Sequence, residues 1–469
     1  MKNRCLSVTT DSIRKHVYLL ILMGSLTACT DFVEVELPKQ QISTEAVFNN
    51  PATVDAAFKS IYIKMRDFGL LNGGSNGLNI LLGLYTDELE LNTQDESLES
   101  YQNHTLLASN ASIKGWWDLA YNQVFAANAI LEGIENSVSL TTQEADQFKG
   151  EALFIRAYLH VLLVELFGDI PYITTTDHIE NTTVSRLPRA VVYDNIIADL
   201  ILATDLLPDE DVSGQRTRPY ATVAEAVLAR AYLYTEQWTL AEAVADKVII
   251  QFGALEPDLD KVFLKDGSGT IWQFKPNADG NNTSEGAVFI FTGPPEIVLT
   301  ESLFFAFESG TIFQPGDQRQ SKWINTVIIG TDIWRHAFKY RERNNTGNSI
   351  EYPIQLRLAE QYLIRAEARA QLGDVPGAQA DINAIRNRAG LGNTTATTLN
   401  ELLEAILQER RVELFAEKGH RWFDLKRMGK TKNVLEPIKV GWKNTDILLP
   451  IPASEIALNP NLLPQNDGY

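Results

Sequence analysis

The spacing of hydrophobic residues predicts a protein built mainly from α-helices. From Lys114 onwards, apolar positions recur with the period of a helix face over most of the chain. An earlier helix should begin at Asn50-Pro51, because proline at the first helical position loses no hydrogen bond, and should run to about Asp67. Further helices are expected at about 190–207, 220–235 and 238–251.

One predicted helix is apolar on nearly every face. It opens with a capping box, Thr141-x-x-Glu144, and should stop at Gly168. Arg156 and Glu165 interrupt its apolar run, which argues against a membrane span. The pattern therefore predicts a helix at the centre of the protein core.

Two segments of the chain resemble each other and predict stacked helix hairpins. Ala229 aligns with Ala366 and Ala241 with Ala378, at a constant offset of 137 residues. Small residues at this spacing let two antiparallel helices approach closely, as in tetratricopeptide repeats. Between the two units, residues of about 252–352 are rich in Gly, Pro and Asn turns, with strand-like runs at 270–274 and 287–291. Such an irregular, aromatic-bearing insertion on a helical scaffold is a common place for binding sites.

The amino-terminal residues predict export and lipid attachment. Basic residues, a short apolar run and small residues lead to Leu26-Thr27-Ala28-Cys29, which resembles a bacterial lipobox. We expect a signal peptide over residues 1–28 and acylation of Cys29. The rest, 29–469, is expected to form a single domain: a helical scaffold of about 44–251 and 353–430 carrying the loop-rich insertion of about 252–352.

Charge and cysteine content narrow the possible partners. The formal net charge is −19; the leader contributes +3, so −22 remains after its removal. A surface this acidic repels nucleic acid. Of the 2 Cys, one lies in the leader and the other would carry lipid, so no internal disulfide is expected.

The sequence gives little sign of catalysis. Gly73-Gly-Ser-Asn-Gly77 fits the G-x-S-x-G pattern, but no buried strand precedes the serine, as a nucleophile elbow requires. The 6 His show no metal-ligand spacing. Glu409–Arg427 alternates carboxylates and cations, which indicates either an anion site or, as we favour, a buried ion-pair lock on the last helices. We expect no enzymatic activity, catalytic residue, metal or cofactor.

Several motifs in order resemble the SusD/RagB family of Bacteroidetes outer-membrane lipoproteins, and they cover nearly the whole mature chain. One is E-R-R-x-E-L-F-A-E-x-G-H-R-W-F-D-L-K-R at 409–427, and another is R-A-Y-x-x-x-x-L-V-E-L-F-G-D-I-P at 156–171. The others are W-x-x-x-Y-x-x-V-x-x-A-N at 117–128, L-R-L-A-E-x-Y-L-I-R-A-E-A at 356–368 and the tail N-P-N-L-L-P-Q-N-D-G-Y. Asp467 departs from the usual Pro of the family, and the chain is short for the group.

The resemblance implies a SusD-like fold, all-α in the main, with four tetratricopeptide-like helix pairs. It also implies a lipid-anchored protein at the outer membrane, facing the cell exterior, that binds an oligosaccharide or polysaccharide. The bound glycan would be delivered to a SusC-like TonB-dependent transporter. The alternatives are the same fold binding peptides or another nutrient, and a non-catalytic assembly scaffold.

The resemblance further implies where the ligand is held. Aromatic side chains from the loop before the W-x-x-x-Y helix and from the central insertion should form the site. Aromatic faces pack on sugar C–H groups, while an amide can pair with two hydroxyls. In this chain the expected ligand-binding residues are Tyr101, Asn103 and His104 on one side and Trp272, Phe313 and Trp323 on the other.

Overall fold

A computed structural model describes residues 47–310 and 316–469 of the chain. Phe48–Tyr469 form one compact unit. The predicted signal peptide, Cys29 and Phe313 lie outside the described residues. The expected division of 29–469 into scaffold and insertion stays a proposal.

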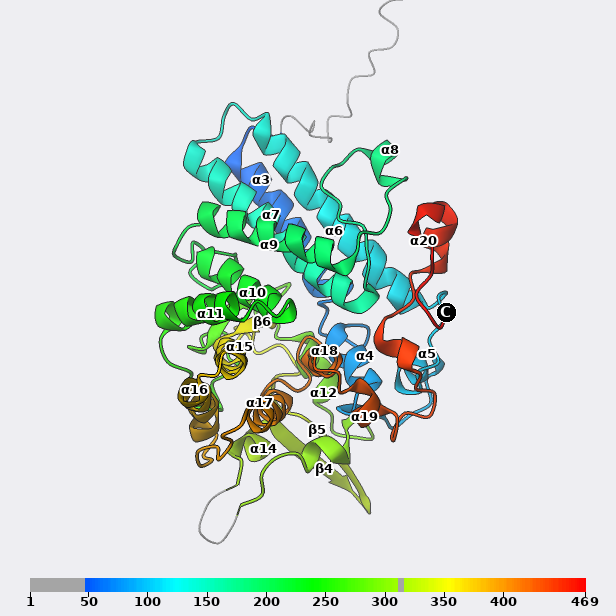
Figure 1. Cartoon of the computed structure of the whole chain (residues 1–469), viewed down its shortest axis with the longest axis vertical. Helices are drawn as coiled ribbons and strands as arrows, with labels where there is room; N and C mark the ends of the chain where they lie inside the picture. Colours follow the sequence, from blue (N-terminus) through cyan, green and yellow to red (C-terminus); the bar gives the residue numbers. More distant parts are fainter. Residues whose placement is uncertain (1–46, 311–315) are drawn as a thin grey trace, which may run out of the picture. The chain divides into compact units, whose positions relative to one another are not determined.

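Nine long helices dominate the described chain, and the predicted fold class, all-α in the main, is confirmed (Figure 1). They are α3 (Pro51–Asp67), α6 (Ala111–Glu135), α7 (Thr142–Phe167), α9 (Arg189–Leu206), α10 (Ala221–Tyr234), α11 (Trp238–Phe252), α15 (Leu358–Gln371), α16 (Val375–Arg388) and α17 (Leu399–Glu413). Shorter helices are α4 (Leu78–Tyr85), α5 (Glu96–Gln102), α8 (His178–Asn181), α12 (Ser284–Phe289), α13 (Glu301–Phe304), α14 (Gln318–Trp323), α18 (His420–Arg427), α19 (Thr431–Leu435), α20 (Ala453–Leu458), η1 (Asn444–Ile447) and η2 (Pro460–Leu462).

At the predicted helix starts, the structure shows the capping hydrogen bonds that the sequence indicates. The Asn50 side chain accepts a hydrogen bond from the Ala52 amide at the start of α3. Thr141 and Glu144 form the predicted capping box of α7, each side chain accepting from the other's backbone N–H. The helix ends at Gly168, whose φ of 74° lies in the left-handed region that favours glycine.

Helix α7 is the buried central helix that the sequence predicts. Its interrupting polar residues pair with the neighbouring α9: Arg156 Nε lies 2.7 Å from Asp199, and Glu165 lies 2.7 Å from Arg189. Within the described part of the chain, no helix combines the length and apolarity needed to span a bilayer.

The two resembling segments form two helix hairpins, α10–α11 and α15–α16, and α11 packs against α15 (Figure 1). The four aligned alanines are all fully buried between these helices, as their small size predicts. Ahead of them, α3 packs on α6, α6 on α7, α7 on α9 and α9 on α10. Four helix pairs therefore follow one another along the chain: α3–α6, α7–α9, α10–α11 and α15–α16.

Three small antiparallel sheets organise the central insertion and join it to the helices. They pair β1 (Leu89–Leu91) with β3 (Ile297–Leu299), β2 (Thr270–Gln273) with β6 (Ile354–Arg357), and β4 (Ile324–Ile329) with β5 (Asp332–Ala337). The predicted strand at 270–274 is confirmed as β2. The predicted strand at 287–291 is wrong: most of it lies in α12, whose first turn is capped by the Thr283 side chain accepting from the Gly286 amide.

The polar segment 409–427 is a buried ion-pair lock, the interpretation favoured from the sequence. Glu413 is fully buried and lies 2.9 Å from Arg357, 2.5 Å from Arg388 and 3.2 Å from Arg319. Arg410 pairs with Asp424 at 2.7 Å. These pairs connect α14, β6, α16, α17 and α18.

Candidate functional site

The three predicted ligand-binding residues near α5 lie close together but mostly inside the protein. Tyr101 is fully buried, with its ring centroid 6.4 Å from that of Tyr85. His104 stacks on Tyr85 at 3.8 Å and lies 3.3 Å from Asp446. Asn103, the cap residue that ends α5, is half-buried. The two rings thus anchor α5 to α4 and to the segment before the carboxyl-terminal tail.

The predicted residues of the insertion are also buried, and they lie apart from Tyr101 and His104. Trp272 on β2 is enclosed by an aromatic cluster that includes Phe154 and Tyr158 of α7, at 5.1 and 5.4 Å between ring centroids. Trp323 donates its indole N–H to the Leu259 carbonyl at 2.9 Å and is fully buried. No ring contact among the described residues joins Trp272 or Trp323 to Tyr101 or His104.

In this structure, Tyr101, Trp272 and Trp323 therefore present no aromatic face to solvent. Their assignment to ligand binding stays a prediction. The physical role that the structure gives them is in the core, where each removes a large apolar surface from water.

A different tryptophan has the exposure that a stacking platform needs. Of the 8 Trp, six contact another aromatic ring or donate a hydrogen bond from the indole. Trp334 and Trp238 are half-buried, and within the described residues neither ring makes such a contact. Trp334 lies on β5, in the β4–β5 hairpin at the lower end of Figure 1.

The hairpin brings an amide and a second aromatic ring to the Trp334 side. Trp334 pairs with Val327 and His336 with Asn325, so all four share one face of the two strands. Asn325 is exposed and is the diagonal neighbour of Trp334, within reach of a long side chain. Half-buried Phe291 lies 4.7 Å from the His336 ring. We call these five residues the Trp334 face.

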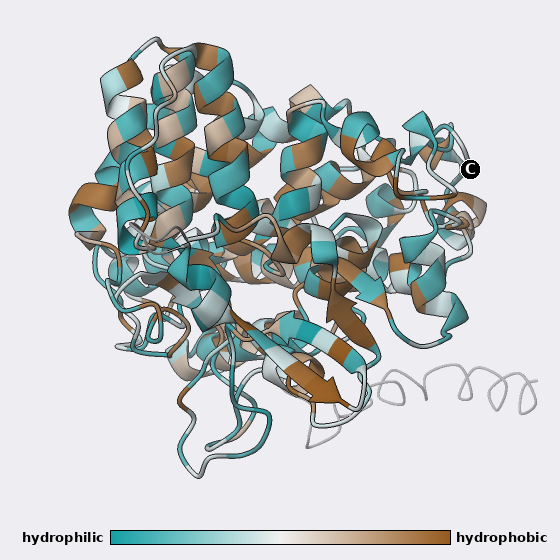
Figure 2. Cartoon of the chain, turned by 90° about the horizontal axis from the view of Figure 1, so that it is seen from below, coloured by the Kyte–Doolittle hydropathy of each residue, from teal (hydrophilic) through white to brown (hydrophobic). Residues whose placement is uncertain are grey.

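The opposite side of the hairpin holds it in place. The Arg335 guanidinium lies 4.1 Å from the Phe304 ring centroid and 3.7 Å from a carboxylate oxygen of Glu301, both on α13. On the Trp334 face, burial lowers the pKa of His336, so its imidazole is neutral at physiological pH and adds no charge. Figure 2, which views the molecule from this end, shows hydrophobic stretches on the strands there. The Trp334 face is thus a neutral aromatic surface on a hairpin that contacts α13 through Arg335.

The insertion also meets the loop that precedes α6. β1 pairs with β3, and the Asn92 side chain donates to the Pro295 carbonyl at 2.9 Å. β3 in turn lies beside β5. The two regions that the family resemblance names as sources of the site are therefore neighbours, although the particular residues predicted within them are not.

The sequence contains a signal for the hairpin that carries Trp334. Two strand-like runs, 324–329 and 332–337, flank the two-residue turn Gly330-Thr331, and Gly330 has a φ of 63°. Such a spacing predicts a hairpin. Within the described ranges, no group of three or more His, Cys, Asp or Glu side chains is placed to hold a metal ion.

Two family models match the chain. One, described as "Starch-binding associating with outer membrane", matches residues 31–233, and the other, described as "SusD family", matches residues 308–469. Two relatives from Formosa agariphila, SusD-like proteins P2 and P25, are 28% and 25% identical to the chain. In each case 97% of this chain and 99% of the relative align.

Solved structures share the fold over their full length. A SusD superfamily protein from Bacteroides vulgatus gives a TM-score of 0.79 at 21% identity, covering 90% of this chain and 100% of the other. A laminarin-binding SusD-like protein gives 0.78 at 23% identity, with the same coverage. The two family models together span most of the sequence, and the chain belongs to the SusD family of outer-membrane-associated, carbohydrate-binding proteins.

Proposed function

We propose that this protein is a lipid-anchored cell-surface protein that captures an oligosaccharide or polysaccharide on the Trp334 face. It then delivers the glycan to a SusC-like TonB-dependent transporter and does not itself cleave it. Membership of a carbohydrate-binding family supports the ligand class. The observation that carries the choice of site is Trp334, a half-buried indole diagonal to an exposed amide, whose ring contacts no other aromatic ring and whose N–H has no acceptor among the described residues.

The chemistry of the Trp334 face suits a neutral sugar. An indole covers the apolar face of a pyranose without desolvating many hydroxyls, and the second ring, Phe291, extends the apolar surface. Asn325 offers a donor and an acceptor to adjacent hydroxyls, although its oxygen already accepts from the Thr326 amide at 2.8 Å. With His336 neutral, nothing on this face selects for a charged ligand.

Peptide binding is the second candidate function, and one observation favours it. Within residues 47–310 and 316–469, β5 is the one sheet neighbour of strand β4, and no described strand pairs with the other edge of β4. Ile328 and Ile333 of the hairpin are 65% and 53% exposed. An extended peptide could add a strand to such an edge.

Calorimetry on the purified protein in detergent separates these functions. Laminarin is the first probe, because a solved protein of this fold binds it, followed by starch, xylan and an unstructured peptide mixture. Trp334→Ala should weaken glycan binding by about 2 kcal/mol, roughly 30-fold. The matched control is Ile333→Ala, the adjacent exposed residue on the opposite strand face, which should bind the glycan like the parent.

Each part of the proposal can be contradicted by a separate experimental result. Equal glycan affinities for the parent and Trp334→Ala would show that the glycan site is not on the Trp334 face. Peptide binding that is lost in Ile333→Ala would favour the second candidate function. New reducing ends in the incubated glycan would show an enzyme. Purification from native membranes without an accompanying TonB-dependent barrel would argue against the transporter partnership.

A further inference from the structure

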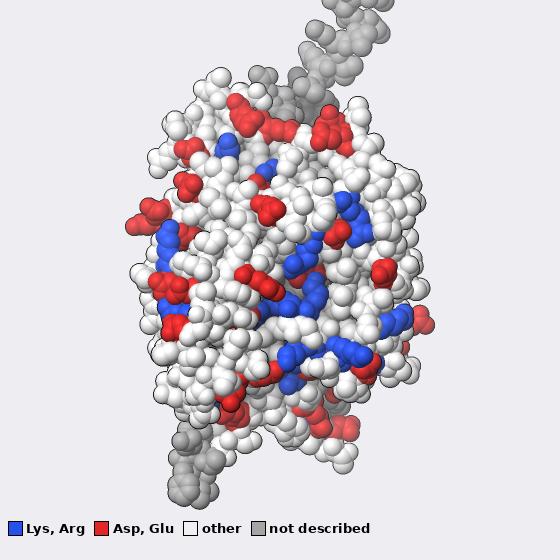
Figure 3. Space-filling view, viewed as in Figure 1, with Lys and Arg blue, Asp and Glu red and all other residues white. Residues whose placement is uncertain are grey.

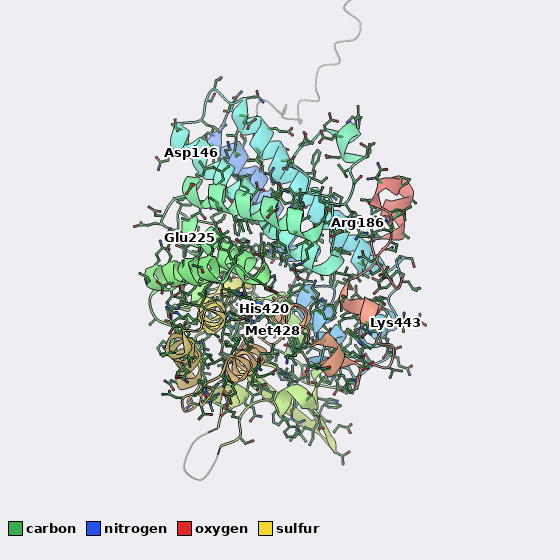
Figure 4. All side chains as sticks on the ribbon, viewed as in Figure 1. Asp146, Arg186, Glu225, His420, Met428 and Lys443 are labelled. Carbon is green, nitrogen blue, oxygen red and sulfur yellow. The ribbon has the colours of Figure 1, made fainter. Side chains whose placement is uncertain are left out.

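A large cleft lies away from the Trp334 face, on the side of the molecule seen in Figure 1. Its volume is about 1440 Å³, larger than the roughly 300–1,000 Å³ of most small-molecule pockets. Its walls come from the end of α7, the α10–α11 turn, α15, α17, α18 and the tail 461–467. Arg186 and Met428, both labelled in Figure 4, line it. We call it the C-terminal cleft; no residue of the Trp334 face lines it.

The charges that line the C-terminal cleft are balanced. Five cations and six carboxylates contribute, and Figure 3 shows Lys and Arg interleaved with Asp and Glu across the middle of this side. Most are already paired with one another: Glu165 with Arg189 and Lys426, and Glu367 with Arg427 at 2.5 Å. An anionic ligand would have to displace these carboxylates, whereas a neutral polar ligand would not.

The cleft also offers side chains with unused hydrogen-bonding capacity. Gln371, Asn400 and Asn444 line three different walls, and none has a side-chain hydrogen bond to another described residue. Each amide supplies two donors and an acceptor. Paired donors and acceptors of this kind match the vicinal hydroxyls of a saccharide.

Trp238 supplies an aromatic face at the same cleft. It is the first residue of α11, half-buried, and its ring contacts no other aromatic ring and its indole N–H no acceptor among the described residues. Its equivalent in the second repeat, at the offset of 137, is Val375, the first residue of α16, which packs against a core cluster. An apolar residue as small as valine is therefore sufficient for the packing of the repeat at this position. The larger indole of Trp238 is not required by that packing.

We infer that the C-terminal cleft is a second saccharide site, which takes a neutral oligosaccharide of several units with one sugar ring stacked on Trp238. The inference rests on the proposed saccharide-binding function, but it uses different residues. Two sites on one chain would let the protein hold a long glycan at two points, which raises avidity through effective concentration.

The test isolates the cleft by removing the other site. In the Trp334→Ala background, the purified protein in detergent is titrated with laminarihexaose, maltohexaose, xylohexaose and hexagalacturonate, and binding is followed by calorimetry and tryptophan fluorescence. At least one neutral hexamer should bind this variant with one-to-one stoichiometry and more tightly than hexagalacturonate. Adding Trp238→Ala should weaken that binding at least tenfold.

Leu240→Ala is the control for the cleft. Leu240 lies on α11, is 44% exposed and does not line the cleft, so its replacement should leave binding unchanged. Melting temperatures equal to that of the background variant should accompany all measurements. If the background variant binds no neutral hexamer while the parent does, the second site is wrong and the proposed function stands. If the parent and the background variant bind the hexamer with the same stoichiometry and affinity, and Trp238→Ala weakens that binding, the cleft is supported and the Trp334 face is wrong. Tighter binding of hexagalacturonate would overturn the neutral ligand class.

Discussion

Glu413 is the residue on which most cations of the ion-pair lock converge. Burial alone would raise its pKa, but the charges of Arg388, Arg357 and Arg319 outweigh burial and hold the pKa well below the usual range of a glutamate. A buried ion pair is not in itself strong evidence for stability, since desolvation offsets much of the attraction. Removing one partner is another matter, because the remaining charges stay buried without compensation.

Replacing Glu413 should therefore cost far more than replacing an exposed glutamate. We expect Glu413→Gln to lower the free energy of unfolding by about 3–5 kcal/mol, measured by urea denaturation at pH 7. The control is Glu404→Gln, which removes a 61%-exposed partner of Lys430 and should cost under about 1 kcal/mol. Because the pKa of Glu413 is depressed, its stabilisation is present above the unfolded pKa and is lost as the pH falls below it. The gap between parent and Glu413→Gln should thus narrow below about pH 4; a gap that widens there would contradict the assignment.

Glu88 should behave in the opposite way. Burial, reinforced by the charge of Asp87, raises its pKa to about 7, and no described residue donates a hydrogen bond to its Oε1. The native state then holds a proton that the unfolded chain releases above about pH 4.5, so stability is lost as the pH rises from there through about 7. Glu88→Gln should stabilise the protein by about 2–3 kcal/mol at pH 8 and hardly at pH 4. Urea midpoints at both pH values test this, with exposed Glu296→Gln as control; equal effects of Glu88→Gln at pH 4 and pH 8 would count against it.

The role of a residue could be predicted from the sequence where the local pattern and the side-chain chemistry indicate the same role. It could not be predicted where the role depends on tertiary packing. The matched charges of 409–427 indicated an ion-pair lock, but its partners Arg319, Arg357 and Arg388 come from distant elements that only the fold brings together. Tyr101, Trp272 and Trp323 sit in turn-rich segments, where an aromatic residue is either a platform or an anchor. Local sequence does not separate those two roles; burial does.

Among the elements, α18 depends on the backbone of a single glycine. Gly419 caps its amino terminus with a φ of 72°, and a Cβ built there would lie 2.4 Å from the Leu82 Cδ1 of α4. The helix carries Trp422, Arg421 and Asp424 into the core, so its approach to α4 fixes part of the lock. Both left-handed backbone strain and close contact oppose a larger residue.

A pair of glycine substitutions separates strain from contact at α18. Gly429, just after the helix, has a similar φ of 64° but no atom within 4 Å of a built Cβ. Gly429→Ala should cost only the backbone strain, about 1–2 kcal/mol. Gly419→Ala should cost about 1–3 kcal/mol more, because Leu82 must move. Differential scanning calorimetry of both variants compares their losses of stability. Equal losses would mean that Leu82 of α4 can shift without an energetic cost.

Element prediction succeeded for the long helices and for β2, and failed for other short elements of the insertion. The caps at Asn50 and Thr141 and the alanine spacing of the repeats are local signals, and the helices follow them. The run at 287–291 has strand-like composition, yet the Thr283 cap starts a helical turn there. The β4–β5 hairpin was not predicted, although the Gly330-Thr331 turn marks it, because its alternation is blurred by exposed isoleucines.

At the scale of the whole molecule, Trp334 and Trp238, whose rings contact no other aromatic ring in the part of the chain that the structure describes, lie on separate surfaces of one compact unit. The two proposed binding surfaces are close to neutral although the formal net charge of the chain is −19, and this balance fits the proposed uncharged ligands. The fold class and family followed from motifs spread over the whole sequence. The positions of the two proposed binding surfaces did not, since they depend on which side chains the packed helices leave uncovered.

Retention at the membrane should depend on one thiol outside this compact unit. If Cys29 is acylated, each buried acyl CH₂ contributes about 0.8 kcal/mol and several chains act together, so attachment would be practically permanent. Cys29→Ala should therefore move the protein from the outer-membrane fraction to the soluble fraction, as measured by fractionation and detergent partitioning. Its urea midpoint and glycan affinity should equal those of the parent, because Phe48–Tyr469 supply the fold and both proposed sites. Cys5→Ala, in the predicted leader, is the matched control and should stay membrane-bound. Unchanged detergent partitioning of Cys29→Ala would contradict the lipobox and require another anchor.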